Sequence, residues 1–313
     1  MDGRGEETRV GGHPPSKGRR RHRSQWGDVF ARLIRNPRAI VGISLLVFMF
    51  LFAFVGPLLS PYAGAKADVS QGNRPPSAEH WLGTDNLGRD VLLRLMEGGR
   101  ISLTVGIIAT AILVAIGTTV GLLAGFYGGW TDTLLMRLVD ILFALPALPL
   151  FITVGAVLSD LKFPPEKRIF VLMLLIGGLS WMGLARLVRS QVLSLREQEF
   201  MLATEVLGLS DRRKLLHHLL PNVAATIIVS GTLAVAGAIV VESALSFLGL
   251  GVIPPTPSWG QMLSAANNLI DFKKRPWLWI PPGVAILVTV LAINILGDAL
   301  RDTLDPRTQR RVR

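Results

Sequence analysis

Six long apolar runs constrain the fold of this chain more than any other feature of its sequence. Most are close to the roughly 20 residues that a helix needs to cross the hydrocarbon core of a bilayer. Their glycines and prolines are compatible with membrane helices, because neighbouring helices satisfy the backbone groups that these residues disturb. The sequence therefore predicts an all-α, polytopic membrane protein with six transmembrane helices. The runs are residues 39–59, 101–126, 134–158, 169–187, 223–252 and 277–296.

The composition supports this fold class. Half of the residues are hydrophobic and only 18% are charged, whereas soluble domains average about 25% charged. The chain has no cysteine, which excludes a disulfide scaffold, thiolate metal sites and cysteine nucleophiles. The first run is longer than the apolar region of a usual signal peptide and follows 38 residues. We therefore interpret it as an uncleaved membrane anchor.

Lysine and arginine counts predict the orientation. With the N-terminus inside, the cytoplasmic segments hold 22 of these residues and the outer segments hold 11, so both termini are expected in the cytoplasm. We interpret the basic stretch 17–23 as a topology determinant near anionic lipid, and not as a nucleic-acid site. The expected organisation is a basic tail (1–38), a first span (39–59), an outer loop with an interfacial helix (60–100), a five-helix core (101–298) and a C-terminal tail (299–313).

Motifs for catalysis by this chain are missing from the sequence. It contains no Gly-x-x-x-x-Gly-Lys-[Ser/Thr] phosphate loop, no His-Glu-x-x-His and no Gly-x-Ser-x-Gly. Its adjacent histidines, His217 and His218, point about 100° apart on a helix and do not form a chelating pair. We therefore expect no catalytic residues, no metal site and no cofactor in this chain.

The basic stretch between the fourth and fifth runs predicts two short helices. The first extends over about 197–207 with acidic residues in its first turn, and Gly208 is placed to end it in a left-handed conformation. Ser210 or Asp211 is placed to cap a second helix, which continues to about residue 220, before Pro221. A short helix this apolar on the cytoplasmic side is expected to contact a partner surface.

The spacing of this stretch resembles the EAA loop of ABC importer permeases, whose pattern is Glu-Ala-Ala, three residues, Gly, nine residues and Ile-x-Leu-Pro. Ala203, Gly208, Leu220 and Pro221 match this pattern. Leu202, Thr204 and His218 replace the family's Glu, second Ala and Ile, which removes the charge at the first position but keeps the helix–glycine–helix geometry. In that family the loop is a coupling helix that docks into a groove of a cytoplasmic ATPase. The resemblance thus implies a coupling loop within 191–221, carried by Glu199, Phe200, Leu202, Ala203, Thr204, Leu207, Gly208, Ser210, Asp211 and Pro221.

Three further blocks look like the peptide/oligopeptide/nickel permease group, and most closely its "C" permease of dipeptide and oligopeptide importers. They are residues 80–91 with 98–103, residues 247–252 with 254–262, and residues 294–306. The resemblance implies a type I ABC importer permease-like fold in a bacterial inner membrane. It also implies a homologous sister permease, two ATP-binding subunits that hold ATP and Mg, and an extracytoplasmic binding protein. Peptides are the expected substrate, with nickel chelates, glutathione or a related solute as alternatives.

The outer block contains the candidate binding-protein-facing residues Asp85, Arg89 and Asp90. The structural interpretation that we favour is an Asx turn at Asp85 and a helix cap at Asp90, with a helix over about 91–97 at the membrane face. Arg137 and Asp140, three residues apart, have the spacing of a structural salt bridge on one helix.

Glu242 is a carboxylate within the fifth apolar run, where a charge is costly and marks a candidate functional site. It either lines the translocation path, hydrogen-bonds to a neighbouring span or lies nearer the outer interface. Two rival functions are a self-sufficient secondary transporter or channel, and a membrane scaffold that transports nothing. The first typically carries inverted repeats and intramembrane ionisable relays, and we find no convincing internal repeat. An ATPase-docking loop separates the importer from both rivals.

Overall fold

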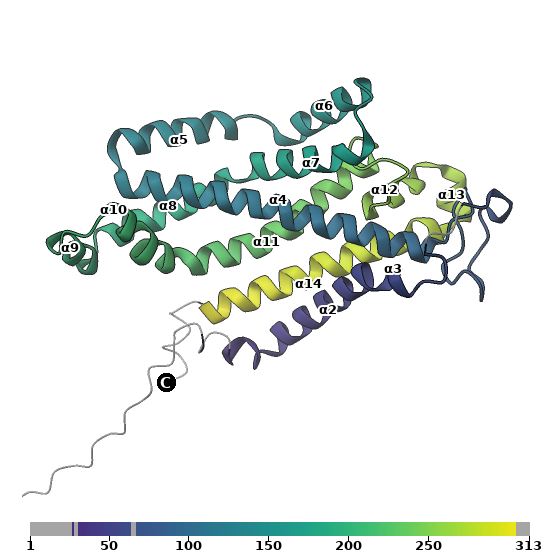
Figure 1. Ribbon diagram of the computed structural model, residues 1–313, viewed down its shortest axis with the longest axis horizontal. Coiled ribbons are helices and arrows are strands. Elements are labelled where there is room, and N and C mark those ends of the chain that lie inside the picture. The colour runs from purple at the N-terminus through teal and green to yellow at the C-terminus, as the bar shows by residue number, and fades with distance from the viewer. Residues whose placement is uncertain (1–26, 28–30, 64–66, 305–313) are drawn as a thin grey trace, which may run out of the picture.

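The computed structural model describes residues 27, 31–63 and 67–304. The basic stretch 17–23 and the last nine residues of the expected C-terminal tail lie outside the described residues. No strand is assigned within the described part, which consists of helices and connecting loops (Figure 1). Among the described residues, five helices are long and apolar enough to cross a membrane, and the number is six if a bent helix pair is counted as one span. The expected all-α membrane fold is confirmed.

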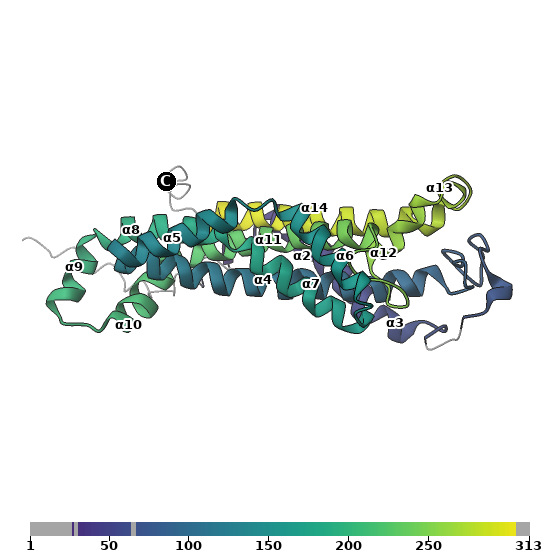
Figure 2. The same cartoon turned by 90° about the horizontal axis from the view of Figure 1, so that it is seen from above.

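The spans alternate in direction, so that two ends of the molecule can be distinguished (Figures 1 and 2). The start of α2 (Pro37–Phe54) and the end of α14 (Ile280–Leu304) lie at the end that carries α9 (Glu199–Val206) and α10 (Asp211–Arg213), which we call the α9 end. The opposite end carries α3 (Gly56–Leu59), α12 (Trp259–Leu263) and α13 (Leu269–Lys274), and we call it the α12 end. The long helices are α2 (Pro37–Phe54), α4 (Val91–Tyr127), α5 (Gly129–Phe143), α6 (Ala147–Asp160), α7 (Pro165–Ser180), α8 (Met182–Arg196), α11 (Leu220–Phe247) and α14 (Ile280–Leu304).

Short elements make up the two ends. The α9 end contains α9 (Glu199–Val206), α10 (Asp211–Arg213) and the π-helical η2 (Lys214–Leu219). The α12 end contains α3 (Gly56–Leu59), η1 (Val69–Gln71), α12 (Trp259–Leu263), η3 (Ser264–Asn267), α13 (Leu269–Lys274) and η4 (Pro276–Leu278).

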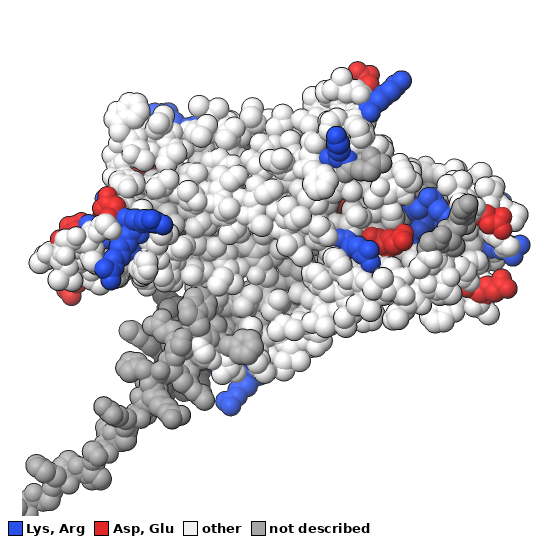
Figure 3. Space-filling model, viewed as in Figure 1, with Lys and Arg blue, Asp and Glu red and all other residues white. Residues whose placement is uncertain are grey.

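Charged side chains gather toward these two ends of the molecule. On the face shown in Figure 3, a broad uncharged band separates a charged group at the α9 end from charged groups toward the α12 end. Many large apolar side chains of the spans are exposed, among them Phe48 at 60% and Leu174 at 65%. Such a band has the composition of a surface that faces lipid.

The second span is longer than the sequence suggested. A single helix, α4, continues from Val91 to Tyr127, so the separate interfacial helix expected over about 91–97 is wrong. Asp90 does cap the helix, as expected, since its carboxylate accepts a hydrogen bond from the Leu93 amide at 2.8 Å. No proline interrupts α4, and Gly98 and Gly99 fit closely against residues Ser258 and Trp259 instead of breaking the helix.

Other boundaries also differ from the expected ones. The helix of the fifth run ends at Phe247, so residues 248–252 belong to the following loop. The last helix continues to Leu304, and the first six residues of the expected C-terminal tail are therefore helical.

The third run is bent and not straight. Helices α5 and α6 meet at an angle of 70°, and Pro146, which has no N–H to donate, lies directly before α6. The expected ion pair between Arg137 and Asp140 is wrong, because the Asp140 carboxylate instead accepts a hydrogen bond from Arg186 of α8 at 2.7 Å. The partner of Asp140 lies on a neighbouring span, and the spacing of residues within its own helix gives no indication of it.

Glycines allow α4 and α8 to approach each other closely. Gly117, Gly121 and Gly125 lie four residues apart on α4 and face α8. A Cβ at Gly121 would lie 2.6 Å from the carbonyl oxygen of Ala185, a distance that real Cβ atoms do not show. Small residues at such contacts let membrane helices pack backbone against backbone, so α4 and α8 form the tightly packed centre of the bundle.

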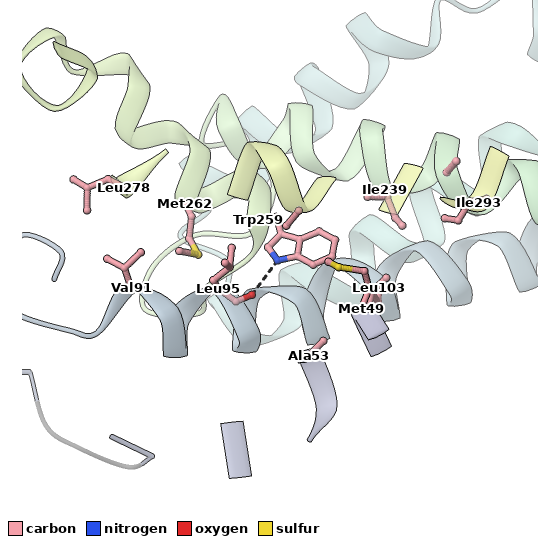
Figure 4. Close-up of a cluster of buried hydrophobic side chains, with 12 residues drawn as sticks. Met49, Ala53, Val91, Leu95, Leu103, Ile239, Trp259, Met262, Leu278 and Ile293 are labelled. Atoms are coloured by element: carbon pink, nitrogen blue, oxygen red, sulfur yellow. Dashed lines mark hydrogen bonds between the residues drawn. The ribbon is translucent and has the colours of Figure 1, made fainter. Parts of the chain in front are cut away.

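Trp259 of α12 fills the core at the α12 end (Figure 4). Its side chain is fully buried, and its indole N–H donates to the carbonyl oxygen of Leu95 in α4 at 2.9 Å. Met49 of α2, Ile239 of α11 and Ile293 of α14 belong to the same cluster. Trp259 therefore anchors α12, and with it the connection between α11 and α14, inside the bundle and not on the bundle surface.

Candidate functional site

A helix–glycine–helix turn forms the α9 end, in the stretch where the sequence predicts a coupling segment. Gly208 has φ +64°, the left-handed conformation that glycine adopts without steric cost. The Gly208 amide donates to the Glu205 carbonyl at 2.9 Å and the Leu209 amide to the Thr204 carbonyl at 3.1 Å. This pair of hydrogen bonds is a Schellman motif, which satisfies the last carbonyls of a helix. The predicted end of the first helix is therefore confirmed.

One face of α9 packs against the bundle and the other is uncovered. Met201 and Thr204 are buried, and the Thr204 hydroxyl donates to the Met201 carbonyl at 2.6 Å. Leu202, Val206 and Leu207 are 56%, 90% and 75% exposed. These three side chains, which we call the α9 tip, form an apolar surface beyond the end of the bundle.

The remaining predicted residues of this segment differ in their burial and in their contacts. Phe200 is half-buried against the core, while Glu199 and Ala203 are exposed. Ser210 holds the N-cap position of α10, but its side chain makes no capping hydrogen bond. The Asp211 carboxylate lies 3.8 Å from the Lys214 ammonium.

The second short helix does not end before Pro221, contrary to the expectation. Residues Asp211–Phe247 form one continuous helical span, with Pro221 in the first turn of α11. The π-helical turn η2 makes this possible: the Leu220 amide donates to Leu215, five residues back. The Asn222 side chain donates to the His218 carbonyl at 2.6 Å. A proline is tolerated where a wider turn and a side chain re-satisfy the backbone.

The three outer-loop residues make mainly internal hydrogen bonds at the α12 end. Asp85 accepts hydrogen bonds from the amides of Leu87 at 2.9 Å and Arg89 at 3.0 Å, and its other oxygen lies 2.7 Å from Arg89 Nε. Asp90, besides capping α4, lies 2.8 Å from Nδ1 of the buried His80. These contacts fit the Asx turn and helix cap. Contact of these residues with a binding protein stays a prediction.

Glu242 is fully buried inside the α12 end. Its carboxylate accepts a hydrogen bond from Ser102 of α4 at 2.9 Å and one from Ser246 at 2.7 Å. This geometry fits the alternative in which the carboxylate bonds to a neighbouring span. A path role for Glu242 stays a prediction, and it would require this hydrogen-bonded network to open.

A groove that the sequence reasoning missed lies between α8, α11 and α14 in the half of the bundle near the α9 end. Its volume is about 680 Å³. Most of the polar groups in the groove are uncharged amides and hydroxyls, and the Gln191 amide donates to the Thr226 hydroxyl at 2.5 Å. Its polar lining comprises Gln191, Ser194, Asn222, Thr226, Ser230 and Arg301.

A signal for this groove is present in the sequence. Asn222, Thr226 and Ser230 follow one another at intervals of four residues, which places them on one face of a helix. In the described part of the chain, no group of three or more His, Asp or Glu side chains is placed to hold a metal ion. The polar lining of the groove therefore consists of amides and hydroxyls together with one charged side chain, that of Arg301.

Two families of known proteins match the chain. The profile of the family described as "binding-protein-dependent transport system inner membrane component" matches residues 117–310, and that of the "N-terminal TM domain of oligopeptide transport permease C" matches residues 24–76. The dipeptide transport system permease protein DppC of Alkalihalophilus pseudofirmus is 41% identical over 294 residues, which cover 94% of each chain. The oligopeptide transport system permease protein OppC of Bacillus subtilis is 39% identical over 287 residues, which cover 92% of this chain and 91% of the relative.

Proposed function

Because the chain belongs to the family of binding-protein-dependent transport system inner membrane components, we propose that it forms the translocation path for peptides together with a homologous sister permease. It is a multi-pass inner-membrane permease of the ABC type. The names of its relatives, dipeptide and oligopeptide permeases, favour peptides as the substrate. Nickel chelates, glutathione or a related solute are the alternatives within the resemblance.

The observation that carries this proposal is the α9 tip. Leu202, Val206 and Leu207 expose apolar side chains at the α9 end, where the described part of the chain leaves them largely uncovered. Large exposed apolar side chains held on a rigid turn are typical of a docking site. In the proposal, two cytoplasmic ATP-binding subunits cover this surface and its counterpart on the sister permease. They bind ATP and Mg, and the chain itself is not an enzyme.

The polar groove supplies the proposed path. A peptide backbone offers N–H and C=O groups at every residue, and the amides and hydroxyls of the groove both donate and accept hydrogen bonds. These neutral groups bind the backbone whatever its side chains are, and the Arg301 guanidinium adds one positive charge to the lining. An extracytoplasmic binding protein delivers the peptide at the α12 end, where Asp85, Arg89 and Asp90 lie.

Ser230→Trp is expected to block uptake, because the indole ring projects into the groove. We expect peptide uptake to fall at least about tenfold, because the ring would occupy space that the peptide needs. Ile228→Trp is the matched control, since Ile228 is 38% exposed and lies about 160° away around α11. Uptake of labelled peptide in proteoliposomes measures the effect. Normal uptake by Ser230→Trp would rule out this groove as the path.

Purification of the tagged chain from its native membrane in mild detergent tests the proposal as a whole. Mass spectrometry is expected to find a sister permease and ATP-binding subunits with the chain. Recovery of the chain alone, stable and monodisperse, would support a stand-alone secondary transporter or channel instead.

A further inference from the structure

A buried carboxylate with hydroxyl partners occupies the centre of the α12 end. No ion pair of the described residues involves Glu242. Its two oxygens instead accept hydrogen bonds from separate serines, Ser246 to Oε1 and Ser102 to Oε2. A third hydroxyl, that of Ser243, lies 3.4 Å from Oε2. A buried polar group in such a network stabilises the arrangement only while each member keeps its partner.

Each of the two serines also binds the backbone of the loop that follows α11. The Val252 amide donates to the Ser246 hydroxyl at 2.9 Å, and the Trp259 amide donates to the Ser102 hydroxyl at 3.2 Å. Each hydroxyl thus accepts from an amide and donates its own proton to Glu242. The single carboxylate therefore holds residues 252–259 near both ends through two serine relays.

The same loop packs so closely against α4 and α11 that the glycines at these contacts cannot be replaced by larger residues. A Cβ at Gly98 of α4 would lie 3.1 Å from the Ser258 backbone, and one at Gly260 would lie 2.5 Å from the Ser243 backbone. The indole of Trp259 reaches into the core between the spans, as Figure 4 shows. The loop is consequently seated on both helices, and the Glu242 network lies at their junction.

The helix that carries Glu242 also begins beside the α9 tip. The continuous span Asp211–Phe247 starts three residues after Gly208 and ends five residues after Glu242. This helix, which includes the π-helical turn η2 and Pro221, connects the two ends of the molecule without a break in the described backbone.

We infer that Glu242 is a positioning residue that clamps residues 248–259 to α4 and α11, so that this loop and the adjoining ends of both helices move as one body. The inference rests on the proposed function in one respect: the movement that it transmits is that of the α9 tip when the ATP-binding subunits close. The clamp itself is a property of this chain alone. It gives Glu242 a role in linking the two ends of the permease and not in contacting the peptide.

Single-cysteine reporters test the clamp directly, because the chain has no cysteine of its own. Val252→Cys and Met262→Cys place a thiol at positions that are 1% and 7% exposed. Reaction with a membrane-impermeant maleimide in membranes measures how often each end of the loop opens. Neither reporter removes the backbone amide that the serine relays bind.

Glu242→Gln is expected to speed labelling at both reporters at least about tenfold, since an amide accepts through one oxygen only and leaves one serine without its acceptor. Ser246→Ala is expected to speed labelling mainly at residue 252, and Ser102→Ala mainly at residue 262. Thr110→Val is the matched control on α4, because the Thr110 hydroxyl is buried without a hydrogen-bond partner among the described residues. We expect it to leave both rates unchanged.

Labelling of Glu242→Gln at the parent rate would overturn the clamp. So would serine variants that speed labelling equally at residues 252 and 262. If Glu242→Gln fails to insert, the serine variants decide the question alone.

Stimulation of ATP hydrolysis by the loaded binding protein supplies the second measurement. Faster labelling with unchanged stimulation would overturn the transmitting role, whereas a chain that recruits no ATP-binding subunits would contradict the proposed function and leave the labelling test intact.

Discussion

Val206→Asp combined with Leu207→Asp is expected to remove the ATP-binding subunits from the purified complex. These two side chains are 90% and 75% exposed in the chain, so the substitutions leave its own stability within about 0.5 kcal/mol. In a docked complex both positions are desolvated, and a buried carboxylate without a partner costs several kcal/mol. We expect at least about a hundredfold weaker association, measured by quantitative mass spectrometry of the co-purified subunits.

Leu269→Asp combined with Ile270→Asp is the matched control for this pair. These neighbouring residues of α13 are 66% and 57% exposed at the opposite end of the bundle. The control complex is expected to retain its ATP-binding subunits. Equal retention by both double variants would show that the α9 tip is not the docking surface.

Gly208→Pro is expected to uncouple ATP hydrolysis from uptake while the chain remains inserted. Proline fixes φ near −65° and cannot adopt the +64° of Gly208, and it also removes the amide that donates to Glu205. The turn between α9 and α10 must therefore rearrange, although a Cβ added at Gly208 would itself meet no atom within 4 Å apart from its chain neighbours. Uptake in proteoliposomes is expected to fall at least about tenfold and to lose its link to the rate of ATP hydrolysis.

Gly208→Asn separates the backbone effect from the loss of glycine itself. Asparagine adopts the left-handed conformation more readily than other residues with a Cβ, and the open space around Gly208 accommodates its side chain. This variant is expected to keep most of the uptake. Unchanged uptake by Gly208→Pro would count against the coupling role of the segment.

Features that depend on local chemistry were predicted from the sequence. The apolar runs gave the membrane fold because a helix in lipid must be long, apolar and internally hydrogen-bonded. The glycine in an otherwise helical stretch predicted the left-handed turn at Gly208. The position of Asp90 predicted a helix cap before residue 91, and Asp90 does cap the helix there, although that helix is the long α4.

Features that depend on distant partners were not predicted. Glu242 is hydrogen-bonded to Ser102, 140 residues away in the chain, and Arg94 is hydrogen-bonded to Gln261, 167 residues away. Asp140 has a partner on another span for which nothing in its local sequence gives a signal. The polar groove, by contrast, was predictable, because Asn222, Thr226 and Ser230 repeat with the period of a helix.

The glycines between α4 and α8 have a consequence for biogenesis. Membrane helices insert independently and then associate, and lipid tails are as apolar as the helix surfaces, so hydrophobicity does not select the partners. The bent α5–α6 span lies between α4 and α8 in the chain, and these two helices therefore meet only after it has been inserted. Their recognition depends on a backbone approach that a single added methyl group at Gly121 obstructs. Close association of these two helices during assembly thus requires the absence of side chains at Gly117, Gly121 and Gly125.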